Sequence, residues 1–270
     1  DRLNEDGIWR GKSEAKDLED PATHTGLKDY NSSIHLLEAL TALYQVSNDE
    51  LVRDRLSQML ELIRDRFTTK EGYLQLYFFR DWTPVSFRGR DRSFIESRLQ
   101  YDHVSWGHDV ETAFLMLEAA HALGRGHDEA TLAVAKRMVD HALDTGWDEA
   151  RGGLWEAGYY FEAEGPCEVV SAEKVWWVAA ESLNALLMMS QLFPEEPRYA
   201  AAFHKQWDYI QAHLIDHRAG GWYPSGLDTN PEAANRPKAQ IWKTSYHDGR
   251  AYMNCIRMLR GAFPLTQEGR

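Results

Sequence analysis

The segment WGHDVETAFLMLEAAHALG (106–124) decides the fold class, because it is apolar on almost every face and too long for a buried strand. Three other segments share this character, namely NSSIHLLEALTALYQV (31–46), EKVWWVAAESLNALLMMSQLF (173–193) and HDGRAYMNCIRMLRGAF (247–263). They recur about every 65–75 residues, a spacing that indicates a repeated structural unit. We expect each segment to form a buried helix.

The first three buried segments are each followed by a helix that is apolar on one side only. These amphipathic segments are NDELVRDRLSQMLELIRDRF (48–67), HDEATLAVAKRMVDHALDTG (127–146) and EPRYAAAFHKQWDYIQAHLID (196–216). Alternation of buried and one-sided helices predicts two layers, an inner and an outer one. An open solenoid would give every helix a similar environment, so the pattern favours an all-α, closed α/α toroid of helix hairpins.

The loops that return the chain from one unit to the next hold the remaining structure. Aromatic and β-branched residues predict a short β-hairpin in segment 72–88, and glycine turns predict further short strands in 152–165 and at 220–224. The opening 30 residues lack periodicity and are expected to form a loop. Because no Pro- or Ser-rich linker interrupts the chain, we expect one domain over residues 1–270.

Composition excludes several functional classes. The net charge of −12 disfavours nucleic-acid binding, which needs a basic surface. No stretch approaches the roughly 18 apolar residues that cross a membrane. Two cysteines form neither a disulfide framework nor a zinc cluster, and the chain opens without a signal peptide, so we expect a cytoplasmic protein. The 10 Trp, 12 Tyr and 10 Phe fill a core or, for some, line a pocket that stacks on rings such as sugars or bases.

Three histidines lie at or near the first turn of a buried segment, namely His35, His108 and His247. The corresponding ends of inner helices converge on one mouth of a toroid, so these imidazoles are expected to share a pocket. Histidine titrates near neutrality, and two imidazoles therefore make a natural proton donor and acceptor pair. A single histidine is more often a packing or capping residue, but recurrence at the same place in three units favours a common site.

Two glutamates accompany the histidines on the apolar segments. Glu111 follows His108 by three residues and shares its helix face, and Glu181 follows Trp177 by four. Both acids could instead carry a helix-end charge or bond to a nearby backbone group. An unpaired buried carboxylate costs several kcal/mol, which favours a function for them.

Motifs of other enzyme classes are missing from the sequence. It contains no G-x-S-x-G elbow, no P-loop and no G-x-G-x-x-G after a strand. Cys167 has no imidazole at a diagnostic spacing, which disfavours a thiol nucleophile. Because the chain has no paired cysteines, zinc is disfavoured too, and we expect neither a metal nor a cofactor.

Four motifs resemble, in the same order, those of the N-acylglucosamine 2-epimerase superfamily, most closely its cellobiose 2-epimerase branch. They are FFRDWTPVS (78–86), SWGHDVE (105–111), KVWWVAAES (174–182) and WKTSYHDGR (242–250). Segment 31–44 resembles a fifth family motif more loosely. The resemblance implies an (α/α)6 barrel of which this chain, with about three and a half helix pairs, would supply the C-terminal two-thirds.

The resemblance also implies inversion of C2 in a reducing aldose, a monosaccharide or a β-1,4-disaccharide such as cellobiose, through an enediolate. It assigns proton transfer to His108 and His247, and substrate binding to His35, Glu111, Trp177, Glu181 and Trp242. Asp248 stands where the family usually has Asn. The portion preceding the chain supplies an arginine at the substrate in the family.

Three other functions remain open at this point. An aldose–ketose isomerase would use the same barrel and return the proton to C1. A glycoside hydrolase would use two carboxylates, such as Glu111 and Glu181, on either side of the scissile bond. A catalytically silent member would bind carbohydrate or protein without exchanging the C2 proton.

Overall fold

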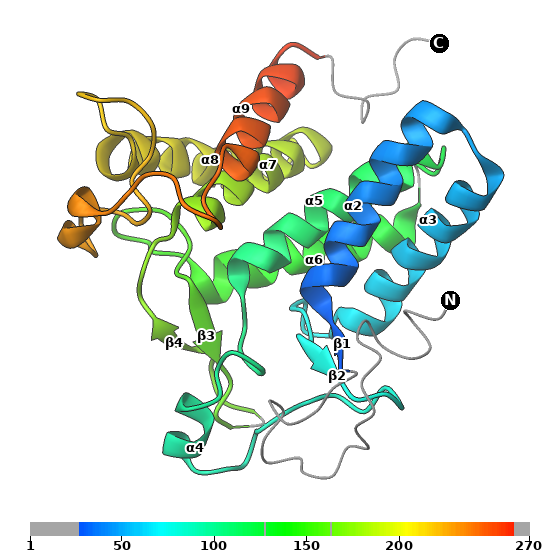
Figure 1. Ribbon diagram of the computed structural model, residues 1–270, viewed down its shortest axis with the longest axis horizontal. Helices are drawn as coiled ribbons and strands as arrows, with labels where there is room; N and C mark the ends of the chain where they lie inside the picture. Colours follow the sequence, from blue (N-terminus) through cyan, green and yellow to red (C-terminus); the bar gives the residue numbers. More distant parts are fainter. Residues whose placement is uncertain (1–26, 127, 163, 262–270) are drawn as a thin grey trace.

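The computed structural model describes residues 27–126, 128–162 and 164–261, and it is mostly helical (Figure 1). Residues 1–26, most of the opening 30 residues expected to form a loop, lie outside the described part of the chain. The main helices are α2 (Tyr30–Ser47), α3 (Glu50–Leu62), α5 (Trp106–Ala122), α6 (Glu129–Gly146), α7 (Trp176–Leu192), α8 (Pro197–Tyr209) and α9 (Tyr246–Leu259). One π-helical turn extends α3 over Ile63–Phe67, and another extends α8 over Ile210–Leu214. Shorter elements are α4 (Arg92–Glu96) and a 3₁₀ turn over Pro231–Asn235. The all-α prediction is confirmed.

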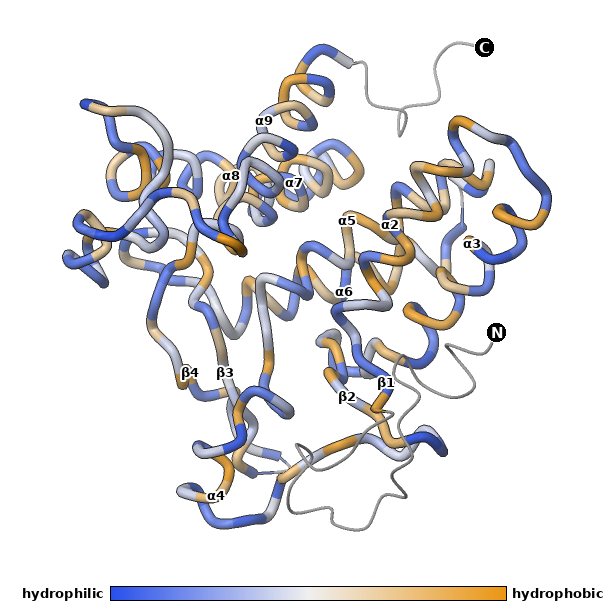
Figure 2. The backbone as a smooth tube through the Cα atoms, in the orientation of Figure 1, coloured by the Kyte–Doolittle hydropathy of each residue, from blue (hydrophilic) through white to orange (hydrophobic). Residues whose placement is uncertain are grey.

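The helices form the two expected layers. Helix α5 packs against α2 on one side and α7 on the other, and α7 also packs against α9 (Figure 1). Helices α3, α6 and α8 each pack against the helix that precedes them in the chain. Hydrophobic residues recur along α2, α5 and α7, whereas many loop residues are hydrophilic (Figure 2). None of the described helices is both long and apolar enough to span a bilayer.

Burial separates the central inner helices from those at the two ends of the series. Helices α5 and α7 are buried on almost every face, as their sequences predict. Helices α2 and α9 are buried on one face only, and they leave apolar side chains such as Val46 (81% exposed) and Leu259 (66%) in contact with solvent. The reason is positional, since among the inner helices α2 packs chiefly against α5 and α9 chiefly against α7. Helices α2 and α9 meet each other through side chains such as Glu38 and Arg250.

The return loops contain short antiparallel pairs, with one departure from expectation. Strand β3 (Ala157–Tyr159) pairs with β4 (Glu168–Ser171), and Trp222 bridges to Ile215, as the glycine turns predict. Strand β2 (Tyr77–Phe78) pairs instead with β1 (Lys28–Asp29), the residues that lead into α2. Within segment 72–88, a single bridge between Phe78 and Pro84 replaces the expected hairpin ladder. This pairing ties the start of the first inner helix to the following loop.

Two of the return loops have the same backbone design. In each, the carboxylate of an aspartate accepts hydrogen bonds from the second and third backbone N–H groups after it, and two glycines of positive φ follow. The aspartates are Asp148 and Asp216, and the glycine pairs are 152–153 and 220–221. A side chain other than glycine is strained at positive φ, so the glycines are needed for the turn.

A lysine that comes later in the chain closes each of these two loops. Lys174 Nζ donates to Asp148 Oδ2 at 2.5 Å, and Lys238 Nζ donates to Asp216. Both ammonium groups also donate to the carbonyl oxygen of the first glycine of their loop, at 2.7 and 2.8 Å. The side chain of Lys174 is 1% exposed and that of Lys238 is 28% exposed. The unit detected from helix periodicity therefore extends to the loops.

Candidate active site

The beginnings of three inner helices bring three predicted site residues together. His108 is the third residue of α5, Trp177 the second of α7 and His247 the second of α9. The indole ring of Trp177 lies 4.4 Å from the His108 ring and 5.8 Å from the His247 ring, measured between centroids. Two imidazoles separated by 139 residues of chain thus contact one aromatic platform.

The residue before His108 makes room for this platform. A Cβ atom on Gly107 would lie 2.6 Å from the indole ring of Trp177 and 2.7 Å from Val178. Only glycine allows α5 and α7 to approach this closely. The glycine of the W-G-H-D-V-E stretch therefore has a packing role, whereas the histidine that follows it faces the site.

The environment of His108 favours a neutral imidazole. Its Nδ1 lies 2.6 Å from Ser105 Oγ and 3.5 Å from the Tyr30 hydroxyl. Burial, together with the neighbouring histidines 103, 35 and 247, holds the pKa of His108 well below its usual range. An Nδ1–H that donates to Ser105 leaves the Nε2 lone pair as a base. Nε2 makes no hydrogen bond to the described residues.

His247 has a carboxylate partner instead. Its Nδ1 lies 2.7 Å from Glu181 Oε1 and 3.9 Å from Glu111 Oε1. A carboxylate at this position accepts the Nδ1–H and fixes the orientation of the ring. The two histidines thus have contrasting partners, a neutral hydroxyl for His108 and a carboxylate for His247.

The two glutamates form a fully buried pair around one guanidinium. Arg250 Nη2 donates to Glu181 Oε1 at 2.7 Å and to Glu111 Oε1 at 2.9 Å. Burial and the adjacent Glu181 raise the pKa of Glu111 to about 8, against the opposing charges of Arg250 and His247. Burial opposes ionisation of Glu181 too, but Arg250 and the hydrogen bond from His247 lower its pKa. Near neutral pH the pair therefore favours a single proton, with Glu111 the more readily protonated of the two.

His35 lies beside this group and is connected to it through Glu38. Its Nδ1 is 3.2 Å from Glu38 Oε2 and 3.4 Å from the Tyr246 hydroxyl. Tyr246 and Arg250 both donate to the same Glu38 carboxylate. Burial opposes the charge of Glu38, yet the His35 hydrogen bond and the charge of Arg250 lower its pKa to about 2. The predicted third histidine thus belongs to the α2–α9 contact.

Glu111, Glu181 and His247 could in principle hold a cation. One donor atom from each lies within 4.8 Å of the others. Arg250, however, already donates to both carboxylates and supplies the positive charge that they require. A metal would have to displace a buried guanidinium, so these residues do not fit one. The expectation that no metal is needed stays a prediction.

One predicted residue is not brought into the group. Trp242 lies in the tight turn Gln240–Lys243 ahead of α9, and it is 78% exposed. Its role at a substrate therefore stays a prediction. Conversely, sequence reasoning missed Glu38, Ser105 and Arg250. Each lies three residues from a predicted histidine, so a search for polar partners at helical spacing would have found them.

Comparison with known proteins supports the resemblance seen in the motifs. The family model described as N-acylglucosamine 2-epimerase matches residues 3–251. The chain belongs to this family. A cellobiose 2-epimerase from Dictyoglomus turgidum is 24% identical in an alignment of 241 positions that covers 86% of this chain and 54% of the relative. A D-mannose isomerase from Marinomonas mediterranea is 25% identical and covers 85% of this chain and 56% of the relative.

Solved structures agree with the family and the fold. The cellobiose 2-epimerase from Bacillus thermoamylovorans matches with a TM-score of 0.70 and 25% identity, over 86% of this chain and 53% of that structure. A glycoside hydrolase family 76 mannosidase from Bacteroides thetaiotaomicron matches with a TM-score of 0.53 at 9% identity, which shows a shared fold alone. The chain spans about half the length of the curated relatives that it matches. The (α/α)6-type prediction is confirmed at the level of the fold.

Proposed function

We propose that the protein is a sugar 2-epimerase that inverts C2 of a reducing aldose, a monosaccharide or a β-1,4-disaccharide such as cellobiose. The observation that supports this most directly is the pairing of His108 and His247 across the indole of Trp177. Family membership and the cellobiose 2-epimerase relatives support the same reaction class. The free thiols Cys167 and Cys255 fit a reducing compartment, and we propose the cytoplasm.

The chemistry follows from the different surroundings of the two rings. Neutral His108 removes the proton from C2, the electron pair of that C–H bond forms the C1–C2 double bond, and the negative charge moves onto the carbonyl oxygen to give an enediolate. The His247 imidazolium then gives a proton to the opposite face of C2 as the C1 carbonyl re-forms. His108 is left protonated and His247 neutral, and proton exchange with water restores both. Each positioned acid or base contributes about 10²–10⁴-fold. The indole offers an apolar face against which the ring of a sugar can stack.

A second candidate is an aldose–ketose isomerase, which the D-mannose isomerase relatives favour. Both reactions share the enediolate, and they differ only in the carbon that regains the proton. Incubation of single aldoses in D₂O followed by NMR distinguishes them. An epimer deuterated at C2 supports the proposal, and a ketose as the main product supports the isomerase.

Matched histidine variants test the assigned residues. His108→Ala and His247→Ala are each expected to abolish deuterium incorporation at C2 with the helical circular dichroism signal unchanged. His204→Ala, an exposed histidine on α8, is the control and should exchange at the rate of the unmodified protein. Full exchange in either site variant would contradict the assignment. No exchange of any aldose by the unmodified protein would overturn the proposed function.

A further inference from the structure

One guanidinium connects all four inner helices. Arg250 lies on α9, and its Nη1 donates to Glu38 of α2. Its Nη2 donates to Glu111 of α5 and to Glu181 of α7, at 2.9 and 2.7 Å. The side chain of Arg250 is 13% exposed, and the side chains of Glu111 and Glu181 are fully buried. Arginine suits this role because its planar group presents several donors in fixed directions.

The same carboxylate oxygen links Arg250 to His247. Glu181 Oε1 accepts from Arg250 Nη2 and lies 2.7 Å from His247 Nδ1. A carboxylate held by a guanidinium has a fixed position, so the imidazole that bonds to it has a fixed position too. A metal-bound or catalytic histidine is commonly oriented in this way, by the hydrogen bond that its second nitrogen makes.

We propose that Arg250 is a positioning residue that orients His247 through Glu181 and makes proton transfer depend on the docking of all four inner helices. This inference rests on the proposed function, since it assigns His247 a proton-transfer role. Arg250 itself touches carboxylates and does not need to touch the sugar. Its contribution has two separable parts, the direction of its hydrogen bonds and its positive charge.

The charged surroundings of this contact come from every inner helix. They comprise His35 and Glu38 on α2, His108, Glu111 and Glu118 on α5, Glu181 on α7, and Tyr246, His247 and Cys255 on α9. The four glutamates outnumber the two arginines that act on this set, Arg250 and, at Glu118, Arg257. Removal of the Arg250 guanidinium therefore favours proton binding by its neighbours, since a nearby opposite charge shifts the pKa of a carboxyl by about 1–3 units.

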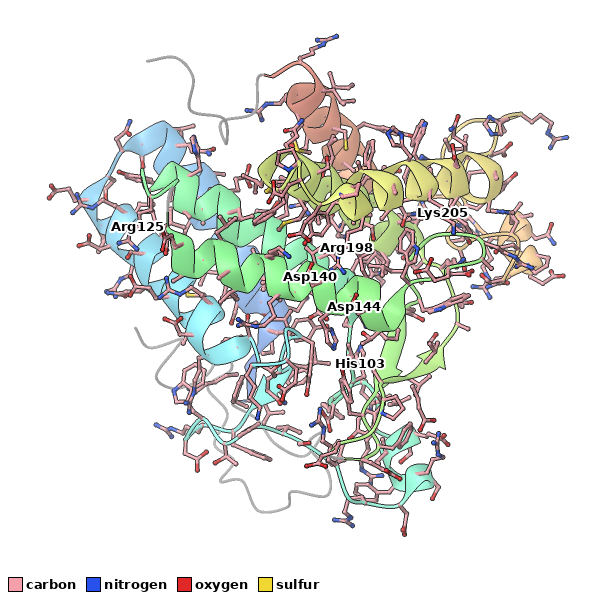
Figure 3. The ribbon with its side chains drawn as sticks, turned by 180° about the vertical axis from the view of Figure 1, so that it is seen from behind. His103, Arg125, Asp140, Asp144, Arg198 and Lys205 are labelled. Carbon is pink, nitrogen blue, oxygen red and sulfur yellow. The ribbon has the colours of Figure 1, made fainter. Side chains whose placement is uncertain are left out.

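Three variants separate direction from charge. Arg250→Met removes both, Arg250→Lys keeps the charge but cannot reach three carboxylates at once, and Arg198→Met is the control. Arg198 joins α8 to Asp140 and Asp144 of α6 on the outer face, and its side chain is 40% exposed (Figure 3). An exposed ion pair of this kind contributes little to stability. Arg198→Met is therefore expected to match the unmodified protein in activity and pH profile.

The readout is the pH dependence of kcat for C2 deuterium exchange. Arg250→Met is expected to lower kcat about 10²-fold or more, to change KM little, and to move the basic limb of the profile to higher pH by about 1–3 units. Arg250→Lys should lower kcat but leave that limb in place. If Arg250 only held the fold together, kcat would fall with the folded fraction and the limb would stay in place in both variants, which would overturn the inference.

An NMR measurement keeps the inference separate from the proposed function. The Nδ1–H of the His247 ring, which Glu181 accepts, should give a protected NMR signal in the unmodified protein and lose that protection in Arg250→Met, whether or not a substrate is turned over. If no aldose exchanges, the proposed function fails, and the ring signal still tests the contact. An unchanged ring signal in a folded Arg250→Met variant overturns the inference. If that variant does not fold, Arg250→Lys with an unchanged kcat overturns it.

Discussion

Replacement of Glu111 by glutamine tests whether the buried carboxyl pair keeps one proton. Glutamine has nearly the shape of a protonated glutamate, so Glu111→Gln imitates the form that the structure favours. Glu181→Gln is the matched variant, because it neutralises the carboxyl that accepts from both Arg250 and His247. Both substitutions replace a carboxyl group with an amide, and both residues accept a hydrogen bond from Arg250. Their effects should nevertheless differ in sign and in pH dependence.

The magnitude follows from the raised pKa of Glu111. Between its ordinary value of 4.5 and about 8, the folded protein holds a proton that the unfolded chain has released. The contribution of the Glu111 carboxyl to the free energy of unfolding is therefore fully present below about pH 4.5. It falls by about 1.4 kcal/mol for each pH unit as the pH rises through that interval. Glutamine does not titrate. The free energy of unfolding of Glu111→Gln, minus that of the unmodified protein, should rise by the same slope.

Glu181→Gln should behave in the opposite way. The carboxylate of Glu181 stabilises the fold at neutral pH, because Arg250 lowers its pKa, and this contribution fades as the pH falls through the folded value. Loss of one partner of a buried ion pair costs about 3–5 kcal/mol, so the variant is expected to be markedly less stable near pH 7.

Urea unfolding at several values between about pH 5.5 and about pH 7.5 measures both effects. The Glu111→Gln difference should grow with pH across this range. The Glu181→Gln loss should be large and nearly constant across it, because the contribution of a carboxyl with a lowered pKa is lost only below the ordinary value of 4.5. Parallel curves for Glu111→Gln and the unmodified protein would refute the single-proton description. So would an equal loss of stability in the two variants at pH 7.

Two further predictions concern the loops and the aromatic platform. Lys174→Met should lower the free energy of unfolding, measured in urea, by about 3–5 kcal/mol, because the ammonium that it removes is fully buried beside Asp148. Lys238→Met should cost less, because the Lys238 side chain is 28% exposed, and equal losses would count against a role for lysine burial. Gly107→Ala should displace the indole of Trp177, lower the free energy of unfolding by about 1–3 kcal/mol and slow C2 deuterium exchange about 100-fold. Unimpaired exchange, measured by NMR, would disprove this steric reasoning.

Much of the fold follows from periodicity, and the exceptions have a physical reason. Apolar residues on every face of segments 106–124 and 173–193 predict helices with neighbours all round, as α5 and α7 are. The same reasoning overestimates the burial of α9, because hydropathy records what a helix could bury and not how many neighbours it has. The pairing of β2 with β1 was missed for a related reason. Strand partners distant in sequence leave no local pattern.

The site was predictable in part. Recurrence at helix starts singled out His108 and His247, and a shared helix position brought Glu111 to the same contact. Arg250 was overlooked although it lies in the quoted motif, because its meaning depends on carboxylates that are 69 and 139 residues away. Local spacing shows which side chains share a face. It does not show which faces meet.

The position of Arg250 in the chain has a consequence for synthesis. Helices emerge in chain order, so α5 and α7 are complete before α9 leaves the ribosome. Until then the carboxyls of Glu111 and Glu181 have no guanidinium partner. The cation that contacts both carboxyls and the imidazole that bonds to Glu181 lie within one turn of α9, so both enter the contact together when that helix packs against α7.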